Sequence, residues 1–386
     1  MCSRTYSRRT FLQTTAFGAA AAVLGQLPSR RTFAESPATQ PAEKPLYRFV
    51  LLGDTHYDLP QHHDMDWVNV KYPKDLNQIK GYIETSQQHT PALLQRVKEI
   101  ITTSDIPVPF VLHVGDLVEG LCGSYELASR QFGDALQLIE KTNFGVPFLM
   151  CKGNHDITGP GAAAAYEKIL LPWLSKQVDS PITRAAFSRR NNDDLFVFFD
   201  SYQPDLDWLE AEFKKHANAR HTFFVIHQPV VPYNDRVDWI VYAKDDVSAQ
   251  RQRLLNLLGQ RNAIVLSGHL HKYSLLERHT PAGPFSQLAV CSVLRSDHPQ
   301  AHEERNGLQA YSADLLDLEP KFEPATREAR RSCLQDERPQ IRRFEYADLP
   351  GLAVVNVYAK DVRCDVFPGI DEKPYRTESL IVRPVT

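Results

Sequence analysis

The stretch Phe49-Val50-Leu51-Leu52-Gly53-Asp54-Thr55-His56 joins an apolar run to a glycine turn and two candidate metal ligands. The run 48–52 is short and mostly apolar on both faces, as expected of a strand that is buried on both sides of a sheet. Gly53 lets the chain turn sharply and lets the backbone approach an ion closely. The stretch therefore predicts a buried strand that presents Asp54 and His56 at its end.

Similar short runs, rich in β-branched and aromatic residues, recur along the chain. They occupy residues 110–114, 146–150, 196–199, 222–226, 263–267, 287–293 and 352–358. Stretches with apolar residues at helical spacing lie between several of them, at 90–102, 124–142, 162–176, 205–216 and 248–260. Because strands that alternate with helices are typical of layered α/β domains, we expect an α/β fold.

Five short polar motifs follow predicted strands directly. They are Gly53-Asp54-Thr55-His56, Gly115-Asp116-Leu117-Val118-Glu119-Gly120, Gly153-Asn154-His155-Asp156, His227-Gln228-Pro229 and Gly268-His269-Leu270-His271. Because ligands bind at the carboxyl ends of strands in open α/β sheets, we expect all five motifs to line one crevice. Each motif alone is weak, since a Gly-Asp pair is usually a turn and a lone histidine such as His113 is usually a core residue. Their repetition after five strands favours a metal site.

The side chains in these motifs are two carboxylates, one amide oxygen and several imidazoles. The candidate ligands are Asp54, His56, Asp116, Asn154, His227, His269 and His271. Mixed nitrogen and oxygen ligands without thiolates suit Mn, Fe, Zn or Co. Seven ligands are too many for one ion but suit two ions with a bridging carboxylate. Such a pair deprotonates a bridging water for attack on phosphorus, and a nearby unbound histidine is then required to protonate the leaving alkoxide.

The ordered series of motifs resembles the calcineurin-like metallophosphoesterase superfamily, whose five blocks span residues 53–271 here. The helix-like segment 205–212, with its Trp208-Leu209 pair, is also similar to a helix of that family. The resemblance implies two packed mixed β-sheets flanked by helices, an αββα sandwich. It covers residues 297–386 only loosely.

The resemblance also implies roles for the residues of the motifs. Asp54, His56 and His271 would hold a first metal, and Asn154, His227 and His269 a second, with Asp116 bridging both. His155 would protonate the leaving group, and Asp156 would orient the His155 imidazole. Purple acid phosphatases of this superfamily carry a tyrosine where this chain has Glu119, and they usually lack a histidine at the position of His56. An iron–tyrosinate centre is therefore not expected, and Mn, Fe and Zn stay open.

The N-terminal segment predicts export rather than structure. Arg8 and Arg9 precede an Ala-rich apolar run, which resembles a twin-arginine signal peptide over residues 1–34. We expect the twin-arginine export machinery as a partner and a periplasmic or otherwise extracytoplasmic location. An ordinary secretory signal or a membrane anchor is the alternative, although Gln26 interrupts the run, and no stable membrane span is expected. The remaining five cysteines, out of 6 in total, show no disulfide or zinc-finger spacing.

Beyond the signal, the pattern predicts a Pro-rich linker at 35–45 and one metallophosphoesterase domain at 46–386. Insertions are expected near 57–89, 229–247 and 297–350. Asp58, His62, His63 and Asp64 could shape a substrate pocket, but a solvated loop is the favoured interpretation. Tyr233, Trp239 and Tyr242 could cover a substrate or pack locally. The charged stretch 319–345 predicts a solvated insertion.

The expected function is hydrolysis of a small phosphate-ester substrate by a hydroxide that bridges two divalent metal ions, with a phosphodiester favoured. A phosphomonoesterase is the main alternative, and a non-catalytic metal-binding protein is a further one. The formal net charge of -3 disfavours extended nucleic acid as a partner, although short oligonucleotides stay open.

Overall fold

The predicted apolar runs form strands of two sheets in the computed structural model, which describes residues 43–234, 247–318 and 324–382. The first sheet contains β1 (Tyr47–Leu52), β2 (Val111–His113), β3 (Phe148–Met150), β12 (Gly351–Val357), β13 (Val362–Pro368) and β14 (Arg376–Ser379). The second contains β4 (Phe187–Asn191), β5 (Asp194–Phe198), β6 (Thr222–Val225), β7 (Ile264–Ser267), β8 (Tyr273–Thr280), β9 (Gly283–Ala289), β10 (Glu304–Asn306) and β11 (Ile341–Ala347).

Both sheets are mixed. Their strand orders are β14-β13-β12-β1-β2-β3 and β10-β11-β8-β9-β7-β6-β5-β4. The strands β1, β2 and β3 run parallel, as do β5, β6, β7 and β9, while the other pairings are antiparallel. The carboxyl ends of the parallel strands therefore lie at a common edge in each sheet, and the five polar motifs follow these ends.

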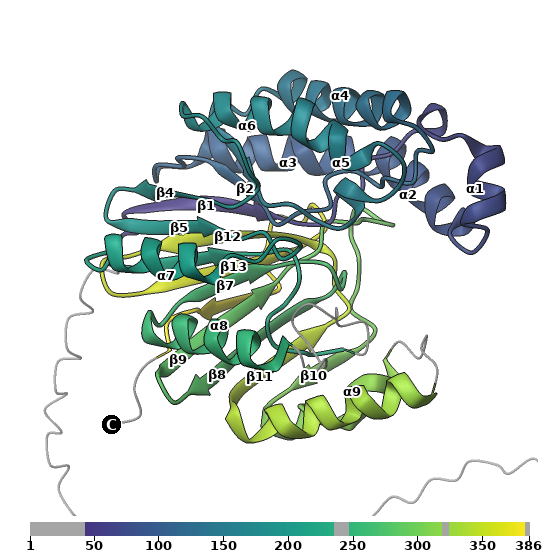
Figure 1. Cartoon of the computed structure of the whole chain (residues 1–386). Coiled ribbons are helices and arrows are strands. Elements are labelled where there is room, and N and C mark those ends of the chain that lie inside the picture. The colour runs from purple at the N-terminus through teal and green to yellow at the C-terminus, as the bar shows by residue number, and fades with distance from the viewer. Residues whose placement is uncertain (1–42, 235–246, 319–323, 383–386) are drawn as a thin grey trace, which may run out of the picture. The chain divides into compact units, whose positions relative to one another are not determined.

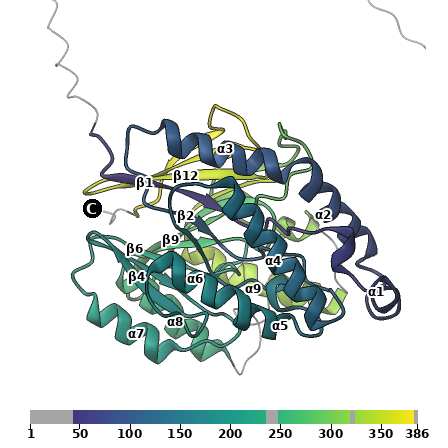
Figure 2. The same ribbon diagram turned by 90° about the horizontal axis from the view of Figure 1, so that it is seen from above.

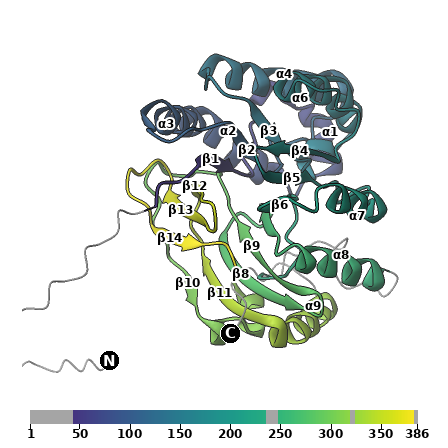
Figure 3. The same ribbon diagram turned by 90° about the vertical axis from the view of Figure 1, so that its left-hand side faces the viewer.

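Helices cover the outer faces of the two sheets, as Figures 1 and 3 show. The helices of the described chain are α1 (Met65–Lys71), α2 (Leu76–Gln88), α3 (Thr90–Thr103), α4 (Tyr125–Thr142), α5 (Ala162–Ala165), α6 (Leu171–Val178), α7 (Leu206–Lys215), α8 (Ser248–Gln260) and α9 (Pro324–Glu337). Helices α3, α4 and α6 lie over the first sheet, and α7, α8 and α9 lie beside the second. The predicted αββα sandwich is confirmed.

Strand β1 shows why its sequence is apolar on both faces. Phe49 and Leu51 point into the core between the sheets, where Phe49 meets Phe196 and Phe223 edge-on. Val50 and Leu52 point the other way, into the core under the helices of the first sheet. Because successive strand residues face opposite sides, one short run contributes to two cores. A third core lies between the second sheet and helices α7 and α8.

Local signals fix the starts of some helices. Ser124 caps α4 by accepting a hydrogen bond from the Leu127 amide at 3.3 Å, and Asp205 caps α7 by accepting one from Trp208 at 2.9 Å. The predicted helix at 162–176 is divided, since a π-helical turn at Tyr166–Leu170 separates α5 from α6. Figure 2 shows α1 and α2, which come from the expected insertion at 57–89, at one end of the helical layer.

Two sequence interpretations need correction. The stretch 319–345 is not simply a solvated insertion, because residues 341–347 form β11 and pair with β8 inside the second sheet. Glu337 at the end of α9 is also buried, where it pairs with Arg251 and Arg278. Charges in this stretch form ion pairs, several of them with residues outside it, and they conceal a structural strand. The run predicted at 287–293 is shifted, since β9 ends at Ala289.

Several predictions fall outside the described residues. They include the signal at 1–34, most of the linker at 35–45, and Trp239 and Tyr242. Tyr233 is described, and it is fully buried in the core of the second sheet. Within the part of the chain that the structure describes, none of the helices has the length and apolar character needed to cross a membrane.

Candidate metal centre

The structure brings all seven predicted ligands together at the strand ends. Four of them, Asp54, His56, Asp116 and His271, offer ligand atoms within 4.8 Å of one another, and we call them the first ligand group. Asp116, His227 and His269 meet the same criterion. Asn154 joins these three, because its Oδ1 lies 2.9 Å from Nδ1 of His269 and 3.1 Å from Nε2 of His227. We call this set the second ligand group, and Asp116 belongs to both.

The donor atoms suit bound cations. Nε2 of His56 and Nε2 of His271 face each other at 2.9 Å, close enough for both nitrogens to bind one ion at about 2.1 Å. Oδ2 of Asp54 is buried and accepts no hydrogen bond. Burial raises the pKa of Asp54, and Asp116 adds to the shift while His227 opposes it. A divalent cation would complete the coordination of this oxygen and compensate its charge.

The backbone at the site has an unusual conformation that makes this convergence possible. Left-handed φ angles occur at Asp54 (53°), His56 (44°), Asp116 (55°), His269 (71°) and His271 (54°). Such angles are strained for residues with a Cβ atom and are typical of functional sites. Two glycines provide the space for the carboxylates: a Cβ on Gly153 would lie 2.1 Å from Oδ1 of Asp116, and one on Gly268 would lie 2.4 Å from Oδ2 of Asp54.

Two ligand imidazoles are oriented by hydrogen bonds on their far side. Nδ1 of His227 donates to the Val114 carbonyl at 2.9 Å, which leaves Nε2 facing Asp116 at 3.0 Å. Nδ1 of His56 lies 2.9 Å from Oε2 of Glu119, which leaves Nε2 facing the first ligand group. Such contacts fix the tautomer and the direction of a metal-binding histidine.

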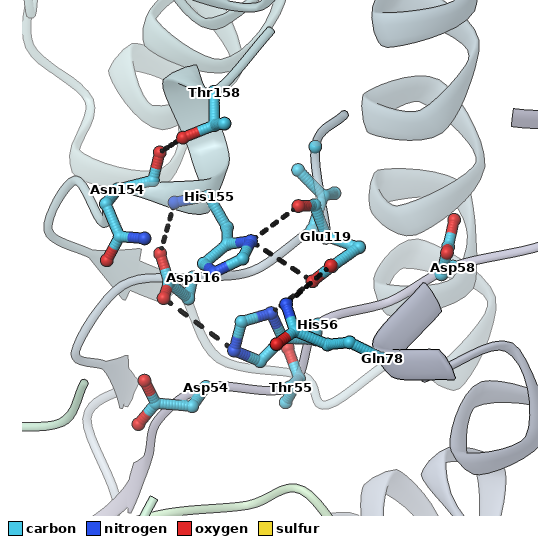
Figure 4. A network of polar contacts seen from close by, with 12 residues as sticks. Asp54, Thr55, His56, Asp58, Gln78, Asp116, Glu119, Asn154, His155 and Thr158 are labelled. Carbon is cyan, nitrogen blue, oxygen red and sulfur yellow. Dashed lines mark hydrogen bonds and ion pairs between the residues drawn. The ribbon is translucent and has the colours of Figure 1, made fainter. Parts of the chain in front are cut away.

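Glu119 is the functional residue that the sequence analysis left without a role. Its carboxylate is fully buried, and its Oε2 lies 2.9 Å from Nδ1 of His56 and 3.1 Å from Nδ1 of His155 (Figure 4). Burial would raise the pKa of Glu119, but His155 and His56 lower it to about 2. Glu119 is thus an ionised carboxylate that links a candidate metal ligand to the candidate proton donor. Its position, where the iron–tyrosinate enzymes have tyrosine, was the signal in the sequence.

His155 is held in an orientation that suits proton donation. Its Nδ1 donates to the Glu119 carbonyl at 2.7 Å, so Nε2 is the nitrogen left to exchange a proton with a substrate. Burial would lower the pKa of His155, but Glu119 and Asp116 raise it to about 10. A bound cation repels the imidazolium and so lowers this pKa when the site is loaded. The imidazole is 18% exposed, enough for contact with a substrate.

Asp156 does not orient His155, which corrects the role implied by the family resemblance. Its carboxylate accepts hydrogen bonds from the backbone amides of Asp116 at 3.1 Å, Leu117 at 2.9 Å and Gly153 at 2.8 Å. Asp156 therefore ties the second motif to the third, and Glu119 takes the orienting role instead. The physical reason is that the buried carboxylate is needed to satisfy several loop amides at once.

Helix α2 of the insertion reaches the site directly. Nε2 of Gln78 donates to Oε1 of Glu119 at 3.0 Å. The Tyr82 ring stacks on the His56 ring, with centroids 4.2 Å apart and an interplanar angle of 8°. Asp75, just before α2, is half-buried, and its pKa is raised by burial and by Glu119. The insertion thus forms part of the wall of the first ligand group.

The residues after the first motif do not form a solvated loop, contrary to the favoured interpretation. Asp58 is fully buried and accepts from Nε2 of Gln131 at 2.8 Å, and it lies 2.7 Å from Nε2 of His63. Nδ1 of His63 donates to the Leu121 carbonyl at 3.1 Å. His62 is buried beside them, whereas Asp64 is exposed and caps α1 by accepting from Trp67. This network ties the inserted segment to the second motif and α4.

The chain belongs to the calcineurin-like phosphoesterase family, whose model matches residues 47–273. Its domain is accordingly that of a phosphoric ester hydrolase. No curated protein sequence matches the chain.

Two solved structures show the same fold. One is a purple acid phosphatase from yellow lupin (Lupinus luteus) seeds, 11% identical, with a TM-score of 0.51 over 88% of this chain and 54% of the lupin chain. The other is GAP50, the anchor in the inner membrane complex of Plasmodium, 13% identical, with a TM-score of 0.50 over 88% of this chain and 90% of GAP50. The chain spans about half of the length of the lupin enzyme. At these identities the comparison shows the fold alone.

Proposed function

We propose that the protein hydrolyses small phosphodiesters with the help of two divalent metal ions. The observation that carries the proposal is the meeting of two ligand groups at one shared carboxylate, Asp116, beside a buried Glu119–His155 pair. When bound, two such ions activate water and neutralise phosphoryl charge. The first ligand group would hold one ion and the second ligand group the other, with Mn, Fe and Zn as the candidate metals.

The chain's own residue His155 would act as the general acid that protonates the leaving group. Glu119 and its carbonyl hold the His155 imidazole through Nδ1, which favours the protonated ring with Nε2–H directed to the leaving-group oxygen. Donation from Nε2 to that oxygen stabilises the departing alcohol. Gln78 holds the second oxygen of Glu119, so the carboxylate keeps one orientation during proton transfer.

The wall that α2 forms favours a small, singly charged ester. The groups that α2 brings to the site, Gln78 and Tyr82, are neutral, and Asp75 beside them is acidic. None of these three supplies a cation for the second negative charge of a phosphomonoester, which favours a phosphodiester.

A test uses metal-free protein reconstituted with Mn²⁺, Fe²⁺ or Zn²⁺, with bis-p-nitrophenyl phosphate and p-nitrophenyl phosphate as substrates. We expect higher kcat/KM for the diester. Higher kcat/KM for the monoester would make the protein a phosphatase. If neither ester nor a wider panel turned over while metals bound, a non-catalytic role would replace hydrolysis.

We also propose export by the twin-arginine machinery to a periplasmic or other extracytoplasmic location. The support is the Arg8-Arg9 pair before an apolar Ala-rich run. Replacing both arginines with lysine should leave the protein in the cytoplasmic fraction. Undiminished export of that variant would refute this route without affecting the proposed chemistry.

A further inference from the structure

A buried ion pair lies two residues along the chain from Asn154, a member of the second ligand group. Nζ of Lys152 is 2.5 Å from Oδ2 of Asp200, and the two side chains are only 9% and 5% exposed. Lys152 follows β3 of the first sheet, and Asp200 follows β5 of the second. The pair therefore joins the two sheets at the edge where the polar motifs lie.

Aromatic rings and backbone amides enclose this pair. The Lys152 ammonium lies 5.8 Å from the centroid of the Tyr166 ring and 5.6 Å from that of the Tyr202 ring, within the range of cation–π attraction. Oδ1 of Asp200 accepts hydrogen bonds from the amides of Tyr202 at 2.9 Å and Gln203 at 3.3 Å. Asp200 thus fixes both the ammonium and the turn that carries Tyr202.

The turn that carries Tyr202 also binds Gln228, the residue next to the candidate metal ligand His227. The buried Gln228 amide donates through Nε2 to the Tyr202 hydroxyl and accepts through Oε1 from the Ser201 hydroxyl. Gln228 directly follows His227 in the chain. At the other end of the network, Lys152 stands two residues before Asn154. The network therefore contacts chain neighbours of two members of the second ligand group, one from each sheet.

The first ligand group has different neighbours. Asp54 and His56 follow β1, and they contact Glu119, Tyr82, His155 and the loops after β2 and β7. Among the contacts of the described residues, none joins Asp54 or His56 to Lys152 or Asp200. A change in the Lys152–Asp200 pair should consequently act on one group more than on the other.

We propose that Lys152 and Asp200 are positioning residues that set the spacing of Asn154 and His227, and thereby the affinity of the second ligand group for its metal ion. This inference rests on the proposed two-metal function. Neither residue belongs to a ligand group. Their role is to hold two ligands from different sheets at the separation that one ion requires.

The variant Asp200→Asn tests the proposal with little change in shape. The asparagine keeps an oxygen for the amides of Tyr202 and Gln203 but removes the charge that holds Lys152. Gln228→Met is a second variant, which keeps the volume of the side chain and removes its hydrogen bonds to the turn. We expect each to weaken one of two Mn²⁺ binding steps by about 10- to 100-fold and to leave the other within about 2-fold.

The chain offers a matched control in Asp194. Its carboxylate is also fully buried and also joins the sheets, since it accepts from the Tyr47 hydroxyl of β1 at 2.8 Å and from Nε of Arg220 at 3.0 Å. Asp194 opens β5, however, and so lies at the edge away from the metal ligands. Asp194→Asn should lower thermal stability and leave both Mn²⁺ steps unchanged.

The measurement is calorimetric titration of the metal-free mature protein with Mn²⁺, joined to electron paramagnetic resonance. At two equivalents of Mn²⁺, the wild type should show a spin-coupled pair, whereas Asp200→Asn should show a larger share of isolated ions. Equal weakening of both steps, or no weakening of either, would overturn the positioning role. If the wild-type chain bound only one ion, both the proposed function and this inference would fail. If the wild type bound two ions and the variants bound them equally well, only this inference would fail.

Discussion

The two ligand groups are supported by different kinds of structure. The first ligand group is backed by α2 of an inserted segment, through Gln78 and Tyr82. The second ligand group is backed by residues that directly follow core strands, through Lys152 and Asp200. An inserted helix can vary with little effect on the sheets, whereas a pair that joins the sheets cannot. The comparison suggests that substrate preference is set on the first side and ion spacing on the second.

The largest effect is expected from replacing Asp116, the residue that the two ligand groups share. Asp116→Ala should abolish binding of both ions and reduce turnover to background, because Asp116 is the only residue common to both groups. Metal content after desalting, with turnover of bis-p-nitrophenyl phosphate, checks this. Retention of two ions by the variant would contradict a bridging position for Asp116.

A second test separates acid catalysis from metal binding. His155→Ala should keep both ions and lower kcat by about 10²- to 10⁴-fold for a diester with an alkoxide leaving group. The loss should be smaller for bis-p-nitrophenyl phosphate, because nitrophenolate departs without a proton. An equal loss for both substrates would show that His155 does something other than protonate the leaving group.

A third test addresses the inserted side alone. Gln78→Leu frees one oxygen of Glu119 and should lower kcat by up to about 10-fold while both Mn²⁺ steps stay intact. Gln88→Leu is the matched control, since Gln88 lies on the same helix and its amide contacts only the exposed Glu84 among the hydrogen bonds described. If the two variants had equal activity, the contact of α2 with Glu119 would have no role in catalysis.

The smallest effect on activity is expected far from both groups, at the buried Glu337. This carboxylate lies 2.5 Å from Arg251 and 2.6 Å from Arg278. Burial would raise its pKa, but the two arginines lower it below the ordinary 4.5. Its charge therefore stabilises the fold above about pH 4.5, and this contribution is lost as the pH falls through the lower folded-state pKa.

Glu337→Gln should accordingly reduce the free energy of unfolding by about 3 kcal/mol at neutral pH, with a smaller difference from wild type in acid. Urea unfolding at pH 7 and pH 4 measures both values, and Mn²⁺ binding should be unchanged. A loss of metal affinity in this variant would mean that the second sheet transmits distant strain to the site.

The sequence predicted the parts of the fold that are apolar on both faces. Strand β1 and its parallel neighbours could be predicted because a strand that is buried on both faces is a continuous apolar run. Strand β11 could not, because Arg343 and Glu345 within it are charged, and their ion pair is visible only in the folded strand. Strand β13 alternates buried and exposed residues, and its neighbour β14 lies at the sheet edge, which leaves too weak an apolar signal.

At the site, too, features that are local in sequence could be predicted, and contacts between distant residues could not. The seven candidate ligands could be predicted because each follows a strand and most follow a glycine, a pattern that is local in sequence. Gln78 and Lys152 could not, because their roles arise from partners 41 and 48 residues away. Glu119 was visible as a departure from a related motif, but only the folded chain shows that it reaches His56 and His155 at once.

Each ligand group draws residues from both sheets, and this has a consequence for how the protein unfolds. A bound ion acts as a cross-link between the two halves of the sandwich, much as a disulfide does in other proteins, while the cysteines that the structure describes are all free thiols. Free ion at 100 times its dissociation constant would add about 2.7 kcal/mol per site to the free energy of unfolding. Removal of the ions by a chelator should therefore lower the free energy of unfolding of the whole domain as well as abolish its activity.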